Sequence, residues 1–309
     1  MVTSIIIPTL NAGDRIVRLL QSIMDQTVVP DEILILDSES TDDTVEKCCR
    51  YEKVKVYHIK RSEFDHGGTR DYGMSKSKGD IVFYLTDDAV IMENDYIESM
   101  LNYFEDEDVA LVTGRQVARP EATEIERLTR EYNYPDKLLI RTKKDISKLG
   151  IKAFFASDVC SAYRKSFYYA VGGFESPILI SEDMLIAAQF LFANMKIVYA
   201  PEAKVIHSHS YTLKQQFSRN FDIGVVLAQH EDIFEGIPVQ SEGIRMVRWV
   251  MRELLRHFRF ISMVHYIFEC AAKLLGNKMG MNYDNLSMKT VMACTMNKKF
   301  WEKDDIRCL

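Results

Sequence analysis

The sequence lacks the features of an exported or membrane-spanning protein. Residues 1–8 carry no basic segment, and their apolar run is too short for the core of a signal peptide. No uninterrupted apolar stretch reaches the roughly 18 residues that a spanning helix requires. We therefore expect a cytoplasmic protein that is not a polytopic enzyme, and peripheral contact with the inner face of the cell membrane stays open.

Three further absences narrow the class of protein. The six cysteines include no C-x-x-C pair and no zinc-finger spacing, which favours reduced thiols. The 39 Lys and Arg residues against 45 Asp and Glu give a net charge of -6, so we expect no nucleic-acid partner. No G-x-G-x-x-G motif follows the first apolar run, and this disfavours a Rossmann oxidoreductase.

What is present indicates an α/β fold. The chain has 309 residues, 47% of them hydrophobic, which is enough for one large domain with an appendage. In its first half, β-branched runs alternate with helical patterns, and this predicts a mostly parallel, Rossmann-like sheet flanked by helices. The strands are expected over residues 3–7, 32–36, 54–59, 81–85 and 109–112.

Three loops of this sheet are expected to form a ligand site. Ligands bind such sheets at the carboxyl ends of the strands, so residues 9–11, 37–39 and 86–89 should converge on one crevice. Asp87 and Asp88 follow one of these strands, and their oxygens suit Mg²⁺ or Mn²⁺ on a diphosphate. The alternative is a solvated acidic turn, which is commoner for an isolated Asp-Asp pair.

Two other carboxylates each have a functional and a structural interpretation. The two are about even for Asp37, whereas the structural one is favoured for Asp183 when its short Ser-Glu-Asp motif is taken alone. Asp37 ends the second strand, where it either accepts the N3-H of a pyrimidine base or caps the next helix. Asp183 precedes a helical pattern, where it either deprotonates an acceptor hydroxyl or complements the helix dipole.

His207 and His209 follow a later apolar run at alternate positions, which places both imidazoles on one face. A single histidine is more often structural. The coincidence with Asp88 favours His207 as a side chain that completes the metal shell.

Residues 64–70 join a strand to a helix and gather several polar groups. Gly67 and Gly68 let the backbone approach a ligand closely, and Arg70 near the helix start could pair with a phosphate. The alternative is an ordinary glycine turn with a surface arginine, which does not explain why His66 and Thr69 stand beside it.

In this order and spacing, the motifs resemble family 2 of the inverting nucleotide-sugar glycosyltransferases, which have the GT-A fold. The resemblance covers roughly residues 3–211 and rests on residues 6–11, 37–42, 84–89, 172–174 and 182–183. Within the family, residues 64–70 and 205–209 look like the branch that uses dTDP-L-rhamnose.

The resemblance implies roles for individual residues. Asp183 would be the catalytic base, and Asp88 and His207 would hold Mg²⁺ or Mn²⁺. Asp37 would read the thymine, and Arg70 would contact the diphosphate. The donor-binding set implied by the resemblance and the expected crevice is Pro8, Thr9, Asn11, Asp37, Ser38, His66, Gly67, Thr69, Arg70 and Asp87.

The expected reaction adds rhamnose to a lipid-linked or oligosaccharide acceptor during cell-surface polysaccharide synthesis. Two departures from the rhamnosyl pattern bear on the donor: Asp87 stands where glutamine is expected, and Asp71 where asparagine is expected. A UDP-sugar donor therefore remains an alternative. A non-catalytic carbohydrate-binding relative is another, because the same fold can persist after activity is lost. The Gln-x-x-Arg-Trp motif of processive relatives is missing from the sequence, which favours one sugar per encounter.

The chain is expected to divide at residue 211. Residues 1–211 form the catalytic domain, with a nucleotide-binding half to about residue 115 and an acceptor-side half from about 116, and residues 212–309 are helical. A helix over 244–261 would carry five arginines, spaced by three and four from Arg245 to Arg259, on one face and apolar residues on the other. Such a helix docks on anionic lipid, packs with a solvated arginine face, or forms a homodimer contact.

Overall fold

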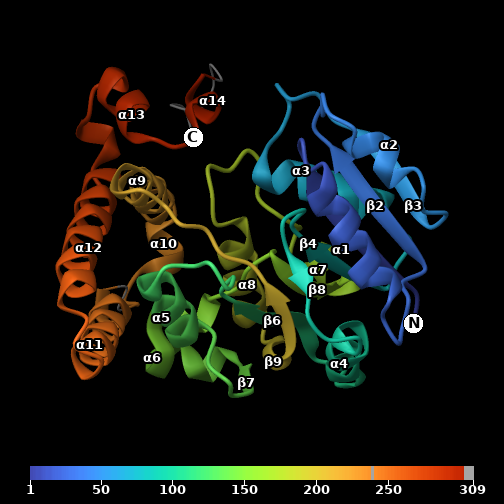
Figure 1. Ribbon diagram of the computed structural model, residues 1–309, viewed down its shortest axis with the longest axis horizontal. Helices are drawn as coiled ribbons and strands as arrows, with labels where there is room; N and C mark the ends of the chain where they lie inside the picture. Colours follow the sequence, from blue (N-terminus) through green and yellow to red (C-terminus); the bar gives the residue numbers. More distant parts are fainter. Residues whose placement is uncertain (238–239, 303–309) are drawn as a thin grey trace.

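The computed structural model describes residues 1–237 and 240–302, and it has the expected α/β fold (Figure 1). Its N-terminal half is a parallel sheet of β3 (Val54–His58), β2 (Glu32–Asp37), β1 (Thr3–Thr9) and β4 (Ile81–Leu85) in that order. Strands β1, β2 and β4 are almost wholly buried because both of their faces are covered.

Helices cover the two faces of this half with different sets of side chains. Ile5 and Ile7 face α1 (Asp14–Met24), whose buried residues recur at helical spacing: Ile16, Leu19, Leu20 and Ile23. Ile6 faces the opposite side, toward α3 (His66–Lys76). The alternation follows from the two-residue repeat of a strand. A short helix, α2 (Thr44–Cys48), follows β2.

Beyond β4 the sheet becomes mixed. It continues through β8 (Cys160–Arg164), β6 (Val109–Val117), β9 (Lys196–Ile206) and β5 (Val90–Ile91), and β7 (Leu139–Arg141) pairs with β9. Strand β9 is one continuous element of 11 residues. Its register with β6 shifts between Gly114 and Arg115, and such an irregularity lets one strand bend without ending.

Two of the remaining helices before residue 212 are long, and the others are short. Helix α5 (Glu124–Asn133) and helix α8 (Glu182–Phe192) flank the ligand site described below. The others are α4 (Tyr96–Asn102), α6 (Ile146–Leu149) and α7 (Lys165–Ala170), with 3-10 turns at Tyr103–Glu105, Lys143–Asp145 and Gly150–Phe154.

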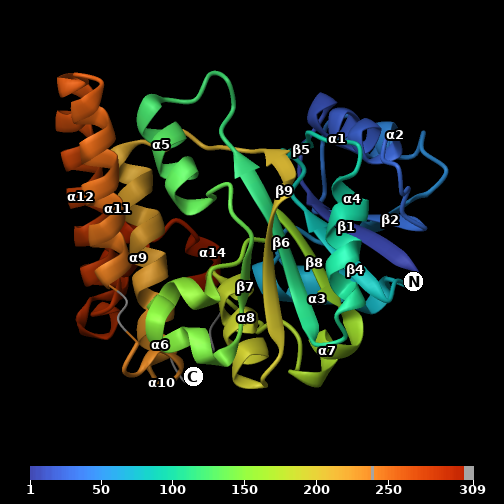
Figure 2. The same ribbon diagram turned by 90° about the horizontal axis from the view of Figure 1, so that it is seen from below.

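The C-terminal region is helical in all its larger elements, as expected. Helices α9 (Leu213–Gln229), α11 (Gln240–Arg256) and α12 (Phe260–Gly280) stand together at one end of the sheet (Figure 2). The smaller elements are α10 (Glu231–Phe234), α13 (Met288–Cys294), α14 (Lys298–Trp301) and a 3-10 turn at Tyr283–Asn285. Among the described residues, none of the helices combines the length and the apolar character needed to cross a bilayer.

The prediction of one helix over residues 244–261 is wrong. Helix α11 ends at Arg256, and the chain reverses through Phe258, whose φ of 54° lies in the left-handed region. Helix α12 begins only at Phe260, so Arg259 lies beyond the turn, where it pairs with Glu124 at 3.0 Å. The five arginines therefore do not form one stripe. The sequence pattern did not indicate the turn, because Phe258 is a residue that also suits a helix.

Helices α9 and α12 pack with their backbones almost in contact. A Cβ atom on Gly276 would lie 2.2 Å from the carbonyl oxygen of Phe217, and one on Gly280 would lie 2.0 Å from that of Phe221. Only glycine fits at such an approach. This packing fixes α12 on α9, and α9 in turn lies beside the ligand site.

Candidate functional site

The three expected loops do converge at the carboxyl ends of the parallel strands. The backbone N–H of Ser38 donates to the carbonyl of Thr9 at 2.9 Å, and that of Leu10 donates to Asp87 Oδ2 at 3.3 Å. They border a cavity of about 530 Å³ whose lining includes Pro8, Thr9, Ser38, Asp87 and Asp88. We call this space the donor cavity.

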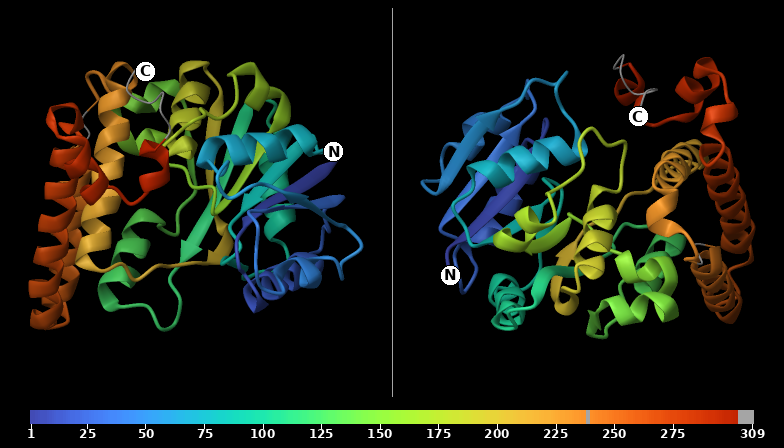
Figure 3. Two further views of the ribbon diagram at one scale, coloured as in Figure 1. Left: turned by 90° about the horizontal axis from the view of Figure 1, so that it is seen from above. Right: turned by 180° about the vertical axis from the view of Figure 1, so that it is seen from behind.

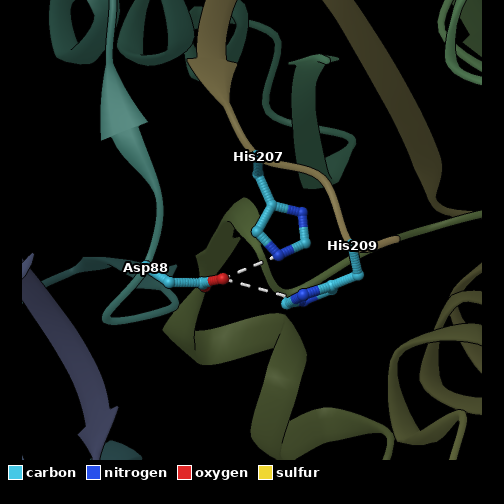
Figure 4. A group of neighbouring side chains, drawn as sticks. All are labelled: Asp88, His207 and His209. Carbon is cyan, nitrogen blue, oxygen red and sulfur yellow. Dashed lines mark ion pairs between the residues drawn. The ribbon is translucent and has the colours of Figure 1, made fainter. Parts of the chain in front are cut away.

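Three side chains that could hold a metal ion, Asp88, His207 and His209, lie together (Figure 4). Asp88 and His209 also line the donor cavity. Asp88 Oδ1 is 3.5 Å from His207 Nε2, and Asp88 Oδ2 is 3.6 Å from His209 Nε2. The ligand atoms of all three lie within 4.8 Å of one another. One carboxylate oxygen with two imidazole nitrogens is a donor set that fits a divalent ion.

The surroundings orient these groups and leave the imidazoles neutral. His207 Nδ1 lies 3.1 Å from Gln116 Oε1, which directs Nε2 toward Asp88. Burial lowers the pKa of His207 to about 3, so its nitrogen is available as a ligand at neutral pH. Burial alone would raise the pKa of Asp88, but His207, His209 and other partners outweigh it and lower this pKa. Arg119 is among them, with Nη2 at 3.2 Å from Asp88 Oδ2.

Asp183 occupies a different carboxylate cluster, in the first turn of α8. The helix begins after Ser181, whose φ is 69°, and the carboxylate of Asp183 accepts hydrogen bonds from the backbone N–H of Met184 at 2.8 Å and of Asp158 at 3.4 Å. Asp183 lines two cavities, of about 380 and 470 Å³. We call the larger the base cavity, and it shares His66, Arg70 and Thr86 with the donor cavity.

Arg70 holds this cluster together. It was expected at the diphosphate, and it lines the donor cavity, but its guanidinium pairs with Asp158 at 3.4 Å and with Glu182 at 3.1 Å. Burial, followed by the charges of Glu182 and Asp158, raises the pKa of Asp183 well above its usual range, and Arg70 opposes this. Burial also raises the pKa of Asp158 to about 6. A carboxyl with a raised pKa is suited to accept a proton near neutral pH.

The glycines that follow His66 serve packing. A Cβ atom on Gly67 would lie 1.9 Å from the carbonyl oxygen of Glu175, so the backbone approaches another loop here and not the donor cavity. Thr69 is buried, and its hydroxyl accepts from the backbone of Asp65 at 3.3 Å. His66 does line the donor cavity, but Gly67 and Thr69 do not.

Two further residues of the expected donor set lie outside the lining of the donor cavity. Asn11 uses its side-chain oxygen to accept from the backbone of Thr41 at 2.8 Å, which ties the first loop to the second. Asp37 is 1% exposed, accepts from the backbone of Ser40 at 3.3 Å and lies 3.3 Å from His58 Nδ1. Asp87 does line the cavity, and burial raises its pKa to about 6 against the effect of Arg15.

Comparison with known proteins shows to which family the chain belongs. The family model of glycosyl transferase family 2 matches residues 4–172, more than half of the chain. The chain belongs to glycosyl transferase family 2.

The family 2 relatives include two that match nearly the whole chain. The O-antigen chain rhamnosyltransferase WbaN of Salmonella anatum is 38% identical over 303 residues, which cover 96% of this chain and 95% of the relative. The O-antigen chain rhamnosyltransferase RfbN of Salmonella typhimurium is 35% identical over 305 residues, covering 97% and 96%. The expected resemblance to the rhamnosyl branch is confirmed.

Two solved structures confirm the fold. The mannosyltransferase PcManGT of Pyrobaculum calidifontis, in complex with GDP-Man and Mn²⁺, superimposes with a TM-score of 0.62 at 14% identity and covers 92% of this chain and 88% of its own. TarS 1-349 of S. aureus, in complex with UDP-GlcNAc, gives 0.55 at 17% identity, with coverage of 84% and 73%.

Several residues of this family 2 site were missed by sequence analysis. His209 was predicted to lie on the same face as His207, but it was not predicted to be a metal ligand. Its position two residues after His207 was the signal that could have indicated this. Asp158 and Arg119 follow no motif, and only long-range packing brings them to Arg70 and Asp88. Asn297 and Lys299 line the donor cavity from the far end of the chain, where no signal was present.

Proposed function

We propose that this family 2 chain is an inverting transferase that moves L-rhamnose from dTDP-L-rhamnose to a saccharide acceptor in cell-surface polysaccharide synthesis. One observation supports transfer most directly. Side chains that could hold a metal ion lie at one cavity, a carboxylate with a raised pKa lines a second, and the two cavities share His66, Arg70 and Thr86. The choice of rhamnose rests on the two O-antigen rhamnosyltransferases that match nearly the whole chain.

In the proposed reaction, Asp183 takes the proton of an acceptor hydroxyl. The hydroxyl oxygen then forms a bond to the anomeric carbon of the sugar as the bond to the diphosphate breaks, so a single displacement inverts that carbon. Mn²⁺ or Mg²⁺ held by Asp88 and His207, with His209 as a further ligand, would supply charge neutralisation for the departing diphosphate. Arg70 keeps the neighbouring acids in place and limits the repulsion that Asp183 experiences.

The donor is tested by a screen that measures release of nucleotide diphosphate. dTDP-rhamnose, UDP-glucose, UDP-N-acetylglucosamine and GDP-mannose are compared at equal concentration with Mn²⁺ and with Mg²⁺. We expect release to be fastest with dTDP-rhamnose. Faster turnover of a UDP-sugar would replace the donor assignment, and no release from any donor, together with retained carbohydrate binding, would favour a non-catalytic relative.

We further propose that the acceptor is lipid-linked and that α12 lies on a membrane surface at the cytoplasmic side. One side of α12 packs on α9 and α11, and the opposite side is at the edge of the molecule (Figure 3). That side carries large apolar side chains that are each more than half exposed, at helical spacing: Ile261, Val264, Ile267, Phe268, Leu274 and Leu275.

The charge of the surrounding region favours an anionic surface. Residues 240–280 contain seven Lys and Arg against three Glu, a net charge of +4 in a chain whose total is -6. A symmetric dimer through α12 would bring two such regions together, whereas an anionic bilayer attracts them. A cavity of about 300 Å³ is lined by His209 and Tyr211 as well as by Met246 of α11 and Lys273 of α12, which links the site to this side of the molecule.

Vesicle co-sedimentation tests this docking surface. Binding to vesicles of phosphatidylglycerol and phosphatidylcholine should fall sharply in the double variant Ile261→Asp/Phe268→Asp, and the matched control Ile140→Asp, on β7, should bind as wild type does. Nucleotide binding should be unchanged in all three proteins. A concentration-dependent dimer that the double variant abolishes, without vesicle binding by wild type, would replace the membrane with a second copy of the chain.

A further inference from the structure

The last described segment of the chain returns to the donor cavity from the helical region. Figure 1 shows α14 between the α9–α13 side of the molecule and the N-terminal half of the sheet. Asn297 and Lys299 both line the donor cavity, and Asn297 also lines the base cavity. The segment 295–301, which we call the C-terminal wall, therefore borders both spaces.

The C-terminal wall is fixed by a buried carboxylate of α9. Asp222, which is 2% exposed, accepts a hydrogen bond from the hydroxyl of Thr295 at 2.7 Å and another from the backbone N–H of Met296 at 2.9 Å. Phe300 and Trp301 are buried in the main hydrophobic core. The wall is thus held at both ends, and the residues between them have a defined position.

The charge balance of the donor cavity assigns a role to Lys299. The diphosphate of a nucleotide sugar is anionic and needs cationic partners. Arg70, which lines the cavity, is engaged by Asp158 and Glu182. The other cationic side chains among the lining residues are Arg15, Arg61 and Lys299. Lys299 is exposed and donates from Nζ to the carbonyl of Arg61 at 3.2 Å, so its charge is not offset by a carboxylate among the described residues.

Asn297 borders both the donor cavity and the base cavity. Asp88 lines the first of these cavities and Asp183 the second, and the reacting carbon must be accessible from both sides. Its side-chain oxygen caps α14 by accepting from the backbone of Phe300 at 3.4 Å. Within residues 1–237 and 240–302, its side-chain NH₂ group makes no hydrogen bond.

We propose that the C-terminal wall completes the donor site: Lys299 binds the diphosphate, and the side-chain NH₂ of Asn297 donates a hydrogen bond to the transferred sugar. This deepens the proposed transferase function and rests on it for the identity of the sugar. The catalytic domain of residues 1–211 is then incomplete by itself, because part of its donor site comes from the helical region.

Calorimetry of nucleotide diphosphates tests the role of Lys299. With Mn²⁺ present, Lys299→Ala should lower the affinity for dTDP by about tenfold, as expected for the loss of a hydrogen bond between charged groups. The matched control is Lys298→Ala, because Lys298 neighbours Lys299 on α14, is exposed, and lines neither the donor cavity nor the base cavity. Equal affinities of Lys299→Ala and Lys298→Ala would overturn the proposal.

The same titrations with UDP separate this proposal from the donor assignment. If wild type prefers UDP, the proposed rhamnose donor is wrong, but Lys299→Ala should still weaken UDP binding relative to Lys298→Ala. Asp222→Asn, which weakens the attachment of the wall, should lower nucleotide affinity in the same direction. Unchanged affinity in Asp222→Asn, with a lowered melting temperature, would count against a wall that needs this attachment.

Asn297→Ser tests the contact with the sugar. Serine can still cap α14, so the fold of the wall is retained, but the side-chain NH₂ group is lost. Affinity for dTDP should be unchanged, whereas affinity for dTDP-rhamnose should fall toward that for dTDP. Equal losses for both ligands, or no loss for either, would overturn the assignment of Asn297.

Discussion

The two carboxylate clusters of the site differ in what surrounds them. Asp88 faces two imidazoles and Arg119, which lower its pKa and keep it ionised. Burial and the charges of Glu182 and Asp158 raise the pKa of Asp183, and the charge of Arg70 opposes them. One aspartate, Asp88, is therefore kept negatively charged, whereas the other, Asp183, is suited to take up a proton. Such a separation of pKa values is how environment assigns different tasks to identical groups.

The largest expected effect is at the base cluster. Asp183→Asn should lower the transfer rate by about 10²- to 10⁴-fold, the range for loss of a general base, because the amide is nearly isosteric but cannot take the proton. Donor and metal affinity, measured on the same preparation by calorimetry, should be nearly unchanged. Retained transfer with a lowered melting temperature would instead give Asp183 a purely structural role.

At the metal cluster, Asp88→Ala should lower affinity for dTDP in the presence of Mn²⁺ by at least about tenfold. Loss of an outer partner of a metal ligand already costs about 10- to 100-fold, and Asp88 is placed as a direct ligand. Without metal, the variant and wild type should bind dTDP similarly. If the two proteins differ equally with and without Mn²⁺, Asp88 contributes through the fold and not through a metal.

Neighbours of Asp183 with opposite charges should shift the pH dependence of the transfer rate in opposite directions. The transfer rate should fall as pH falls through the pKa of Asp183, because only the ionised carboxylate accepts a proton. Glu182→Gln removes a charge that raises this pKa, so the acidic limb of the profile should move to lower pH. Arg70→Gln removes a charge that lowers it, so the limb should move to higher pH. Movement in the same direction for both variants would show that Asp183 does not control this limb.

The smallest effect is expected at His209. Its side chain is 42% exposed, compared with 6% for His207, and no partner corresponding to Gln116 orients it in the described part of the chain. His209→Ala should therefore weaken Mn²⁺ binding less than His207→Ala does, as measured by calorimetry with metal alone. The reverse order would make the more exposed imidazole the principal nitrogen ligand.

The sequence predicted those parts of the site that lie at strand ends. Asp88 and His207 follow apolar strands, and the topology of the sheet brings strand ends together without further information. Local patterns were less informative. The arginine periodicity crosses the turn at Phe258, so the predicted helix was wrong, and Gly67, which was expected to approach a ligand, packs against Glu175. Both depend on which segment lies opposite, and a local pattern carries no information about that.

The residues that sequence analysis missed share this dependence on distant packing. Asp158 acts through Arg70, 88 positions earlier by residue number, and its own sequence context contains no motif. Asn297 and Lys299 lie outside the part of the chain that the family model matches, residues 4–172. Family motifs cover ligand-contacting residues of the shared domain. Residues supplied by an additional region differ from one such region to another, so no family motif predicts them.

The contact between Lys299 and Arg61 joins residues 238 positions apart, and this separation has a consequence for how the protein matures. Contacts of such long range form late in folding because a long loop must close before they are gained. The parallel strands can pair as soon as the first hundred or so residues have left the ribosome, and the donor cavity would then be open on one side. If the C-terminal wall acts as proposed, full affinity for the donor appears only after nearly the whole chain has been synthesised, and incomplete translation products would not sequester the nucleotide sugar.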